Sequence, residues 1–314
     1  MDRSGKPGSS VGLTSERFGD LLDRCGASVT FASSGTELRC GVSGGADSLA
    51  LMALAVASGC EVTAVHVDHG QRSGSKNEAD RVARYAEELG ANFERATVEV
   101  HGKANLEARM RAARYEVLGP DAATGHTMDD QAETVLINLM RGAGLRGLGA
   151  MQPGPRRPIL ALRRSDTEAV CEAMGWAPFF DPSNADPAFV RNRVRSELIP
   201  LLSDIAGRDV VPLLARTADH ARSAVEVVEL AAGDLDPEDA LAVAEAPRAI
   251  AASALQRWVQ AQTGDDYPID AGSVERVLAV ARGDALAAEV TGGHRVSRSA
   301  QRLGVDPSPK LGAP

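Results

Sequence analysis

Cys40-Gly-Val-Ser-Gly-Gly-Ala-Asp-Ser48 is the stretch of this chain that decides its fold. Leu38 to Val42 has the short apolar character of a β-strand, Ser43-Gly44-Gly45 is a sharp turn, and the run from Asp47 to Ala57 has helical length. Adjacent glycines let backbone N–H groups approach an anion, and the start of a helix favours negative charge. The stretch therefore predicts a phosphate-binding turn. It lacks the lysine of G-x-x-x-x-G-K-[ST], so a chemistry different from that of P-loop NTPases is expected.

Strands and helices alternate after this turn. We expect further strands at 61–67, 93–100 and 121–125, and further helices at 77–89, 105–118 and 128–140. The β-branched residues of 61–67 run almost continuously, which is typical of a buried parallel strand. The alternation predicts an α/β domain with a doubly wound parallel sheet. Its ligand should lie at the carboxyl ends of the strands, where Ser43, His66 and His126 fall.

The second half of the chain changes character. A capping-box pattern, Ser165 to Glu168, opens a helix, and 191–202 is a further helix that contains Pro200. Beyond it the chain is Ala-rich and helical, and Glu289 to Arg298 resembles a hairpin with a Gly-Gly turn. We predict an N-terminal domain at 1–206, a smaller, mostly helical domain at 207–305 and a disordered tail at 306–314. The first ten residues are also expected to be disordered.

Composition limits the functional classes. The chain has 314 residues, 44% of them hydrophobic, with no apolar run long enough to span a membrane and no apolar core of a signal peptide in Met1 to Ser10. A cytoplasmic location without membrane contact is the expectation. Cys25, Cys40, Cys60 and Cys171 are scattered without a C-x-x-C pair, so neither a disulfide framework nor a zinc or iron–sulfur site is indicated.

A formal net charge of −9 argues against indiscriminate nucleic-acid binding. The arginines are nevertheless concentrated locally, and the span from Arg141 to Arg164 contains no acid. A second group stands within five residues: Arg191, Arg193 and Arg195. These stretches either form a local RNA-facing strip or simply solvate a surface.

Gly142-Ala-Gly144-Leu-Arg-Gly147 matches the dinucleotide fingerprint G-x-G-x-x-G in letters only. The fingerprint needs a strand before it and a helix after it, whereas here a helix precedes and a proline-rich loop follows. A flexible loop after a helix is the better interpretation.

Candidate chemistry gathers in the helix at 128–140. At 100° per residue, Asp130, Glu133, Ile137 and Arg141 share one face, and Val135, Leu136 and Leu139 lie opposite. The helix dipole by itself favours acids in the first turn, but it does not explain Glu133. Two carboxylates on one face could bind an ammonium group and take its proton.

His66, Asp68 and His69 could suggest a metal site. We expect no metal held by the protein alone, because no further Cys or His cluster accompanies them and ATP brings its own Mg²⁺. Orientation of a nucleotide is the preferred role for His66. For His126 a site role and a simple satisfied polar role stay open.

Six motifs between about Cys40 and Pro200 together resemble the tRNA(Ile)-lysidine synthases, a family of PP-loop N-type ATP pyrophosphatases. They are Ser43-Gly-Gly-Ala-Asp-Ser48, His66-Val-Asp-His-Gly-Gln-Arg72, Asn105-Leu-Glu-x-x-x-Arg111-x-x-Arg114-Tyr115, Gly125-His-x-x-Asp-Asp-Gln-Ala-Glu-Thr134, Arg141-Gly-x-Gly-Leu-x-Gly-Leu148, and Asp181-Pro-Ser-Asn-x-Asp186 with Arg191-Asn-Arg-Val-Arg195. The resemblance implies an adenine nucleotide alpha hydrolase-like fold. It also implies ATP with Mg²⁺, L-lysine and a CAU-anticodon isoleucine tRNA as ligands, and it allows a homodimer.

In the implied reaction ATP adenylylates the C2 carbonyl oxygen of the wobble cytidine, and the lysine side-chain amine then attacks C2 and displaces AMP, which gives lysidine. Three groups of residues follow from it. The catalytic candidates are Asp47, Asp130 and Glu133. The ATP-binding candidates are Ser43, Gly44, Gly45, Ala46, Asp47, Ser48, His66 and His126. The candidates for phosphate and tRNA contacts are Arg111, Arg114, Arg141, Arg191 and Arg195.

The sequence departs from the family pattern at two positions, and three alternative functions stay open. Gln71 stands where the family commonly has Leu, and Thr127 stands where a second His is common. The C-terminal domain is short, so His294, Arg295, Arg298 and Arg302 of its hairpin would have to share the work of binding tRNA. The alternatives are a PP-loop tRNA thiolase, an amidotransfer synthetase, and a non-catalytic nucleotide-dependent RNA-binding module. A thiolase would need a reactive thiol or cluster ligands.

Overall fold

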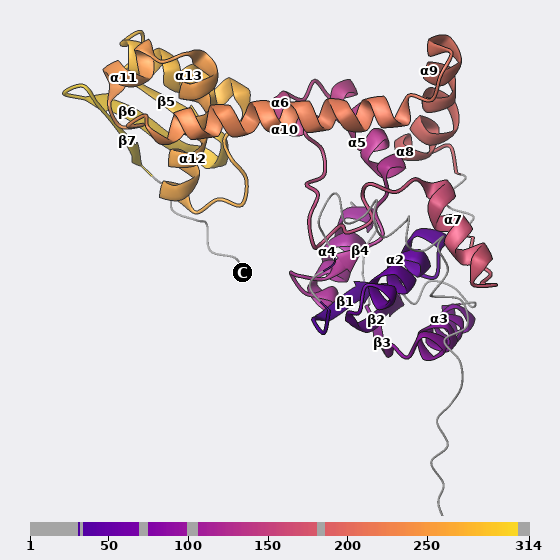
Figure 1. The fold of residues 1–314 in the computed structure, drawn as a ribbon. Coiled ribbons are helices and arrows are strands. Elements are labelled where there is room, and N and C mark those ends of the chain that lie inside the picture. Colours follow the sequence, from indigo (N-terminus) through magenta and orange to yellow (C-terminus); the bar gives the residue numbers. More distant parts are fainter. Residues whose placement is uncertain (1–30, 32–33, 69–74, 99–105, 181–185, 307–314) are drawn as a thin grey trace, which may run out of the picture. The chain divides into compact units, whose positions relative to one another are not determined.

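The computed structural model describes residue 31 and residues 34–68, 75–98, 106–180 and 186–306 (Figure 1). The chain forms two compact units, Met1–Asp219 and His220–Pro314. The predicted boundary between 206 and 207 coincides with the end of helix α9 (Ile199–Ala206), and the two units divide within the next helix, α10 (Val211–Gly233). Each unit has its own hydrophobic core.

The first unit is built on a parallel sheet of four strands in the order β3-β2-β1-β4. The strands are β1 (Glu37–Gly41), β2 (Glu61–Asp68), β3 (Asn92–Thr97) and β4 (Ala123–Thr124). Gly41 pairs with Val65 on one side and with Thr124 on the other, so the carboxyl ends of three strands meet at one edge. The strand order reverses between β1 and β4, which confirms the doubly wound fold.

Helices cover this sheet because the chain supplies long apolar stripes. Helix α2 (Ala46–Ala57) is buried over most of its length, and Leu49, Leu51 and Leu54 have no exposed surface. The other helices of this part are α3 (Ser75–Leu89), α4 (Leu106–Leu118), α5 (Met128–Met140), α6 (Leu145–Leu148) and α7 (Arg164–Ala173). Helix α7 packs against α2 through Val170 and Cys171, which belong to the core of the sheet.

Three local predictions differ from the structure. Strand β3 ends at Thr97, before the predicted residue 100, and the predicted loop after α5 contains the short helix α6. The capping box at Ser165 to Glu168 is wrong. Helix α7 begins at Arg164, and the Asp166 carboxylate accepts a 2.8 Å hydrogen bond from the backbone N–H of Arg163. The acid at the third helical position is Asp166, two residues before the Glu168 that the Ser-x-x-Glu pattern indicates.

The predicted helix at 191–202 is a continuous helical segment of three parts. They are α8 (Val190–Arg193), the π-helix η2 (Val194–Leu198) and α9. Pro200 stands at the start of α9 and has no N–H to donate to the preceding turn, and a wider π-helical turn precedes it.

The second unit combines α11 (Ala240–Glu245), α12 (Arg248–Thr263) and α13 (Ala271–Arg282) with an antiparallel sheet, β5 (Ala287–Val290), β6 (His294–Ser299) and β7 (Arg302–Asp306). The predicted hairpin is confirmed as β5 and β6, joined by the 3₁₀ turn η3 (Thr291–Gly293). Strand β7 was not predicted. Its short sequence, Arg-Leu-Gly-Val-Asp, has only two apolar residues, and its pairing with β6 forms only in the folded unit.

The sequence predicts disordered termini and no membrane-spanning segment. The predicted disordered ends, 1–10 and 306–314, lie outside the described residues except for Asp306, which ends strand β7 and is therefore ordered. Within the described part of the chain, no helix is both long enough and apolar enough to cross a bilayer.

Candidate active site

The predicted phosphate-binding turn lies between β1 and α2. Gly44 has a φ of +90°, a conformation that favours glycine, and it makes the tight turn that the sequence predicts. The Ser43 N–H donates to Ser48 Oγ at 3.1 Å, and Ser48 Oγ donates to the carbonyl of Gly45 at 2.9 Å. Ser48 therefore holds the turn in shape from inside, whereas the Ser43 side chain is the more exposed of the two hydroxyls.

Gly125 brings the end of β4 against the start of α2. A Cβ atom at this position would lie 2.6 Å from the carbonyl oxygen of Asp47 and 2.9 Å from the nitrogen of Ser48. Only glycine permits this approach, because both neighbouring atoms belong to the backbone. The contact lies where the strand order reverses, the usual ligand position in such sheets.

The two predicted nucleotide-binding histidines flank this region. His66 is 3% exposed and its Nδ1 lies 2.9 Å from the carbonyl oxygen of Val42. His126 Nδ1 lies 2.8 Å from the hydroxyl of Thr124. Asp68, the acid of the candidate metal motif, pairs with Arg95 at 2.7 Å. His69 lies outside the described residues.

A second group of side chains meets beside the turn. We call it the acid–arginine cluster, and it consists of Asp47 on α2, Asp130 and Glu133 on α5, Arg164 on α7, Arg191 on α8 and Arg195 on η2. Its carboxylates and guanidinium groups are equal in number. Such a balance makes burial of so many charges tolerable, because each charge faces an opposite one.

Glu133 lies at the centre of the acid–arginine cluster and has no exposed surface. Arg195 grips it with two hydrogen bonds, from Nε to Oε1 at 2.6 Å and from Nη2 to Oε2 at 3.1 Å. Arg164 Nη2 lies 3.4 Å from Oε1, and Arg191 Nε lies 3.8 Å from Oε2. Three arginines thus converge on one carboxylate from two separate segments of the chain.

Asp130 has a structural task as well as a place in the cluster. Its Oδ2 accepts hydrogen bonds from the N–H of Thr127 at 2.9 Å and from the Thr127 hydroxyl at 3.1 Å, which caps α5. Its Oδ1 faces Nη2 of Arg164 at 3.4 Å and Nη2 of Arg195 at 3.6 Å. One oxygen therefore stabilises the helix start while the other points into the cluster.

Asp47 connects the phosphate-binding turn to the cluster. Its Oδ2 lies 3.7 Å from Nε of Arg164, and its Oδ1 accepts a hydrogen bond from the hydroxyl of Thr167. Burial raises the pKa of Asp47 to about 6; the Thr167 hydrogen bond opposes this, and the neighbouring charge of Asp130 adds to it. The side chain is 27% exposed, so it is the carboxylate of the cluster that solvent reaches most.

The structure brings together five of the predicted site residues, Asp47, Asp130, Glu133, Arg191 and Arg195, and leaves others apart. Arg141 is exposed at the C-terminal end of α5. The Nη2 atom of Arg114 lies 3.4 Å from the position of a Cβ on Gly41, at the end of β1. Arg111 lies in α4, but its side chain is outside the described part of the structure.

The predicted two-sided helix at 128–140 is only partly right. Asp130 and Glu133 do share a face, but that face is buried, and Ile137 on the same side is buried too. Leu139, expected on the apolar back, is 56% exposed. Helix α5 is enclosed over its first turns because η2 and α7 supply arginines to its polar face.

Arg164 and Thr167 are site residues that sequence reasoning missed. For Arg163 and Arg164 the sequence left open an RNA-facing strip or a solvated surface, and the structure instead pairs both with carboxylates of the first unit. Arg163 pairs with Asp129 at 3.0 Å and also with Asp209, and Arg164 enters the acid–arginine cluster. The only available signal was their place at a helix start, which gives no information about the distant partner.

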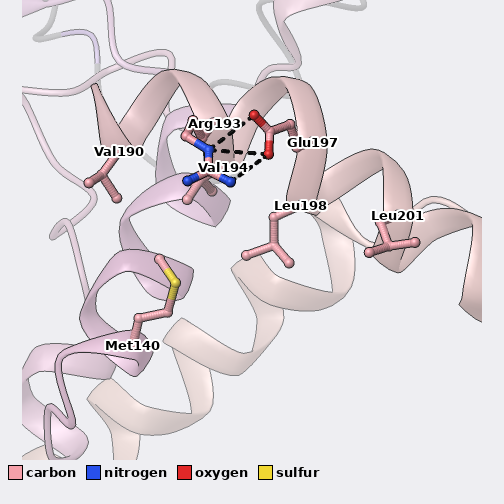
Figure 2. Close-up of a pocket in the computed structure, with 7 residues that line it drawn as sticks. All are labelled: Met140, Val190, Arg193, Val194, Glu197, Leu198 and Leu201. Carbon is pink, nitrogen blue, oxygen red and sulfur yellow. Dashed lines mark hydrogen bonds and ion pairs between the residues drawn. The ribbon is translucent and has the colours of Figure 1, made fainter. Parts of the chain in front are cut away.

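The arginines of the helical segment at 190–206 divide between two faces. Arg191 and Arg195 point to Glu133, whereas Arg193 pairs with Glu197 at 2.9 Å on the rim of an apolar groove of about 310 Å³ (Figure 2). The groove is lined by Met140, Val190, Arg193, Val194, Glu197, Leu198 and Leu201. The spacing of four residues within each pair places its members on one side of the helix.

The polar residues predicted to bind tRNA on the hairpin of the second unit are mostly engaged within it. His294 is 3% exposed and its Nε2 lies 2.9 Å from Asp265. Arg298 donates to the carbonyl of Ala281 at 2.7 Å, and Arg302 pairs with Asp236 and Glu238. Arg295 is exposed. Arg302 is exposed as well, and the RNA-binding role of these residues stays a prediction.

Within the described residues, no group of three or more His, Cys, Asp or Glu side chains is placed to hold a metal ion. In the acid–arginine cluster the carboxylates already face guanidinium groups. Asp47, the most exposed of them, fits the single carboxylate that commonly accompanies phosphate oxygens around Mg²⁺.

A glycine turn at the reversal point of a doubly wound sheet places this chain among the α/β proteins that bind ligands at the carboxyl ends of their strands. A family model described as a PP-loop domain matches residues 21–202. A tRNA(Ile)-lysidine synthase of Salinispora tropica is 40% identical over 303 residues, which cover 86% of this chain and 90% of that protein. The chain belongs to the tRNA(Ile)-lysidine synthase family.

Two other relatives are also tRNA(Ile)-lysidine synthases. The tRNA(Ile)-lysidine synthase of Nocardia farcinica is 41% identical over 245 residues, covering 73% of this chain and 77% of that protein. That of Rhodococcus jostii is 45% identical over 207 residues, covering 63% of this chain and 64% of that protein, just under two thirds of its length. A solved structure titled U34-tRNA thiolase NcsA, from Methanococcus maripaludis, has a TM-score of 0.53 at 16% identity, over 69% of this chain and 86% of that chain. The last likeness concerns the fold alone.

Proposed function

We propose that this chain uses ATP to join L-lysine to C2 of the wobble cytidine of a CAU-anticodon isoleucine tRNA. ATP first adenylylates the C2 oxygen, with release of pyrophosphate, and the lysine side-chain amine then displaces AMP to give lysidine. The observation that carries the proposal is the contact between the phosphate-binding turn and the acid–arginine cluster through Asp47. The names of the relatives support the choice of acceptor and amine.

For the first step, the turn offers the donors that a leaving pyrophosphate needs. The proposed ATP-binding residues are Ser43, Gly44, Gly45, Ala46, Asp47 and Ser48, with His66 and His126 at the neighbouring strand ends. Backbone N–H groups at the start of a long helix stabilise negative charge that develops on phosphate oxygens. Mg²⁺ would arrive with the nucleotide, and Asp47 is the residue proposed to face it.

For the second step, the acid–arginine cluster matches the charges of free lysine. Its carboxylates, Asp130 and Glu133, suit an ammonium group, and its arginines suit the α-carboxylate. In the free protein Arg195 occupies both oxygens of Glu133, so lysine would have to replace part of this pairing. An attacking amine must lose a proton, since its ordinary pKa is about 10.4, and we assign its removal to Asp130 and Glu133.

The proposed tRNA contacts are Arg111, Arg114 and Arg141, with Arg191 and Arg195 closer to the reacting groups. Arg141 is exposed and so is available to a phosphate. A wobble base lies in a loop and can enter a pocket without melting a helix. A cytoplasmic location and a homodimer, both expected from sequence, stay predictions.

The decisive experiment measures pyrophosphate release and the modified nucleoside with the full chain. Release should require tRNA, and only an isoleucine transcript with a CAU anticodon, together with lysine, should yield lysidine. A matched transcript with a CAC anticodon is the control. Equal release with every tRNA, or a permanently modified base without lysine, would contradict the proposal.

A PP-loop tRNA thiolase is the nearest alternative, and the three cysteines that the structure describes argue against it. Cys40, Cys60 and Cys171 are buried thiols, and burial raises the pKa of Cys40 and of Cys171 to about 12. A sulfur-transferring cysteine needs the opposite shift. Replacement of all four cysteines should leave lysidine formation intact, and loss of activity in a folded variant would favour the thiolase. A non-catalytic RNA-binding module would instead show no ATP turnover.

A further inference from the structure

The segment 176–180, which follows α7 and is neither helix nor strand, is attached to α3 at its first two residues. Trp176 is buried and stacks on Tyr85 of α3, with ring centroids 4.8 Å apart, and its Nε1 donates to Glu88 at 2.9 Å. The Tyr85 hydroxyl accepts a 3.0 Å hydrogen bond from the N–H of Ala177. One face of α3 therefore fixes the start of the segment.

The other end of the segment contacts the predicted phosphate-binding turn. The N–H of Phe179 donates to the carbonyl of Gly44 at 2.8 Å. A Cβ atom on Gly44 would lie 3.5 Å from Cγ2 of Val82 and 3.8 Å from Cβ of Phe179, so α3 and the segment both pack on this glycine. Pro178 stands between the N–H donors of Ala177 and Phe179, and its fixed φ limits the freedom of the chain between them.

A turn with two adjacent glycines needs such a contact. Glycines let the backbone approach an anion, but they also lose the most conformational freedom when they are ordered. The carbonyl of Gly44 and the N–H of Gly45 belong to one planar trans peptide, so they point in opposite directions. Because Phe179 holds the carbonyl, the direction of the Gly45 N–H is set before any ligand arrives.

We propose that the segment 176–180 is a strap that positions the turn for ATP, with Tyr85 and Phe179 as its positioning residues. Attachment to α3 brings the N–H of Phe179 to the Gly44 carbonyl. A peptide that is already fixed lowers the ordering cost of binding phosphate oxygens. The strap rests on the proposed function, because it acts through the binding of ATP.

Two independent substitutions release the strap at its two ends. Phe179→Pro removes the N–H that donates to Gly44, and Phe179→Ala is its matched control, because it also removes the phenyl ring but keeps the N–H. Tyr85→Phe removes the hydroxyl that accepts from Ala177 and keeps the stacked ring. Val62→Ala, in the core near the amino end of β2, controls for a general loss of stability.

ATP affinity is measured by calorimetry with the full chain, without tRNA or lysine. Phe179→Pro should bind ATP about 2- to 10-fold more weakly than Phe179→Ala, the range for one hydrogen bond, and Tyr85→Phe should lose a similar factor relative to the wild type. Val62→Ala should lose thermal stability and keep its ATP affinity. Tyr85→Phe decides alone if Phe179→Pro does not fold. Equal affinities in these comparisons, or a wild type that binds no ATP, would overturn the proposal.

Hydrogen exchange gives a second measurement that a merely structural contact would not change. Coupling between two sites is reciprocal, so saturating ATP should slow the exchange of the strap amides in the wild type. Exchange that bound ATP leaves unchanged would overturn the proposal. Neither measurement needs tRNA or lysine, so a wild type that binds ATP and makes no lysidine would contradict the proposed function alone.

Discussion

At the scale of single residues, Asp47 is held in a place that opposes its ionisation. Its carboxyl is largely buried, and the raised pKa, about 6 against an ordinary 3.8, means that the folded state binds a proton more tightly than the unfolded state. The stabilising contribution is therefore present below about pH 4 and is lost as the pH rises through 6. An ionised Asp47 at neutral pH is maintained at a cost to stability, which is common at functional sites.

Asp47→Asn should consequently stabilise the protein at pH 7.5, by about 3 kcal/mol if the whole difference between the two pKa values is expressed. The amide keeps the shape of the carboxyl and can still accept from Thr167. Chemical denaturation at several pH values measures the effect, and the advantage over the wild type should vanish near pH 4. Asp121→Asn, at an exposed turn, is the control and should show little change. A constant difference across the pH range would contradict the account.

Glu133 is fully buried, and three arginines face its carboxylate. Glu133→Gln should destabilise the first unit by about 3 kcal/mol, because Arg195 would lose its two-hydrogen-bond partner and the buried arginines would share only the weaker contacts with Asp130. Thermal unfolding checks this, with Glu197→Gln as the matched control, since Glu197 pairs with Arg193 at an exposed position. An equal loss of thermal stability in both variants would mean that the buried ion pairs of Glu133 contribute no more than the exposed pair of Glu197.

Glu133→Gln also separates the two proposed steps. Where the variant stays folded, lysine transfer should fall more than tRNA-dependent pyrophosphate release, whereas Asp47→Asn should abolish release. One assay measures both steps: released pyrophosphate reports the adenylylation, and the modified nucleoside reports the lysine transfer. Equal loss of release in the two variants would contradict the division of roles.

At the scale of elements, the site depends on how closely helices and strands approach one another. The end of β4 touches the start of α2 at Gly125, and α7 and η2 each carry an arginine to the polar face of α5. Sequence periodicity located most of these elements, including α5 from Met128 to Met140, because helical and strand periods are local properties. It did not identify the partner of each face, because contacts distant in sequence leave no local pattern.

Gly125→Ala should disturb the phosphate-binding turn directly. The added Cβ would lie 2.6 Å from the carbonyl oxygen of Asp47, and backbone on both sides must move, at a cost of about 1–3 kcal/mol. ATP affinity should fall together with thermal stability. Gly144→Ala, at a position with open space and a negative φ, is the control and should retain both. Wild-type ATP affinity in Gly125→Ala would show that the contact does not shape the turn.

At the scale of the whole molecule, the chain has two separate hydrophobic cores. One surrounds the parallel sheet and α2, and the other joins α12, α13 and the antiparallel sheet around Leu255, Leu278 and Val296. The six motifs and the acid–arginine cluster lie in the first unit. ATP binding is therefore expected to depend on the first core alone, whatever the second unit contributes to tRNA.

Leu255→Ala tests this separation. Leu255 has no exposed surface, so its truncation should destabilise the second unit by about 2–5 kcal/mol. Two unfolding transitions are expected, of which only one should shift, and ATP binding to the first unit should be unchanged. Leu241→Ala, at a position 57% exposed in the same unit, is the control. A shift of both transitions together would mean that the units unfold as one.

The strand–turn–helix around Ser43 to Ser48, the strand–helix alternation after it, and the candidate acids Asp47, Asp130 and Glu133 could all be predicted from the amino-acid sequence. These follow from local periodicity, glycine conformations and motif spacing, which each short segment carries independently. The folded chain was needed to show that Asp130 and Glu133 are buried, that arginines from α7, α8 and η2 pair with these acids, and that Asp47 accepts a hydrogen bond from Thr167. The physical reason is that burial and pairing arise between segments up to 120 residues apart along the chain, where neither partner's own sequence specifies the other.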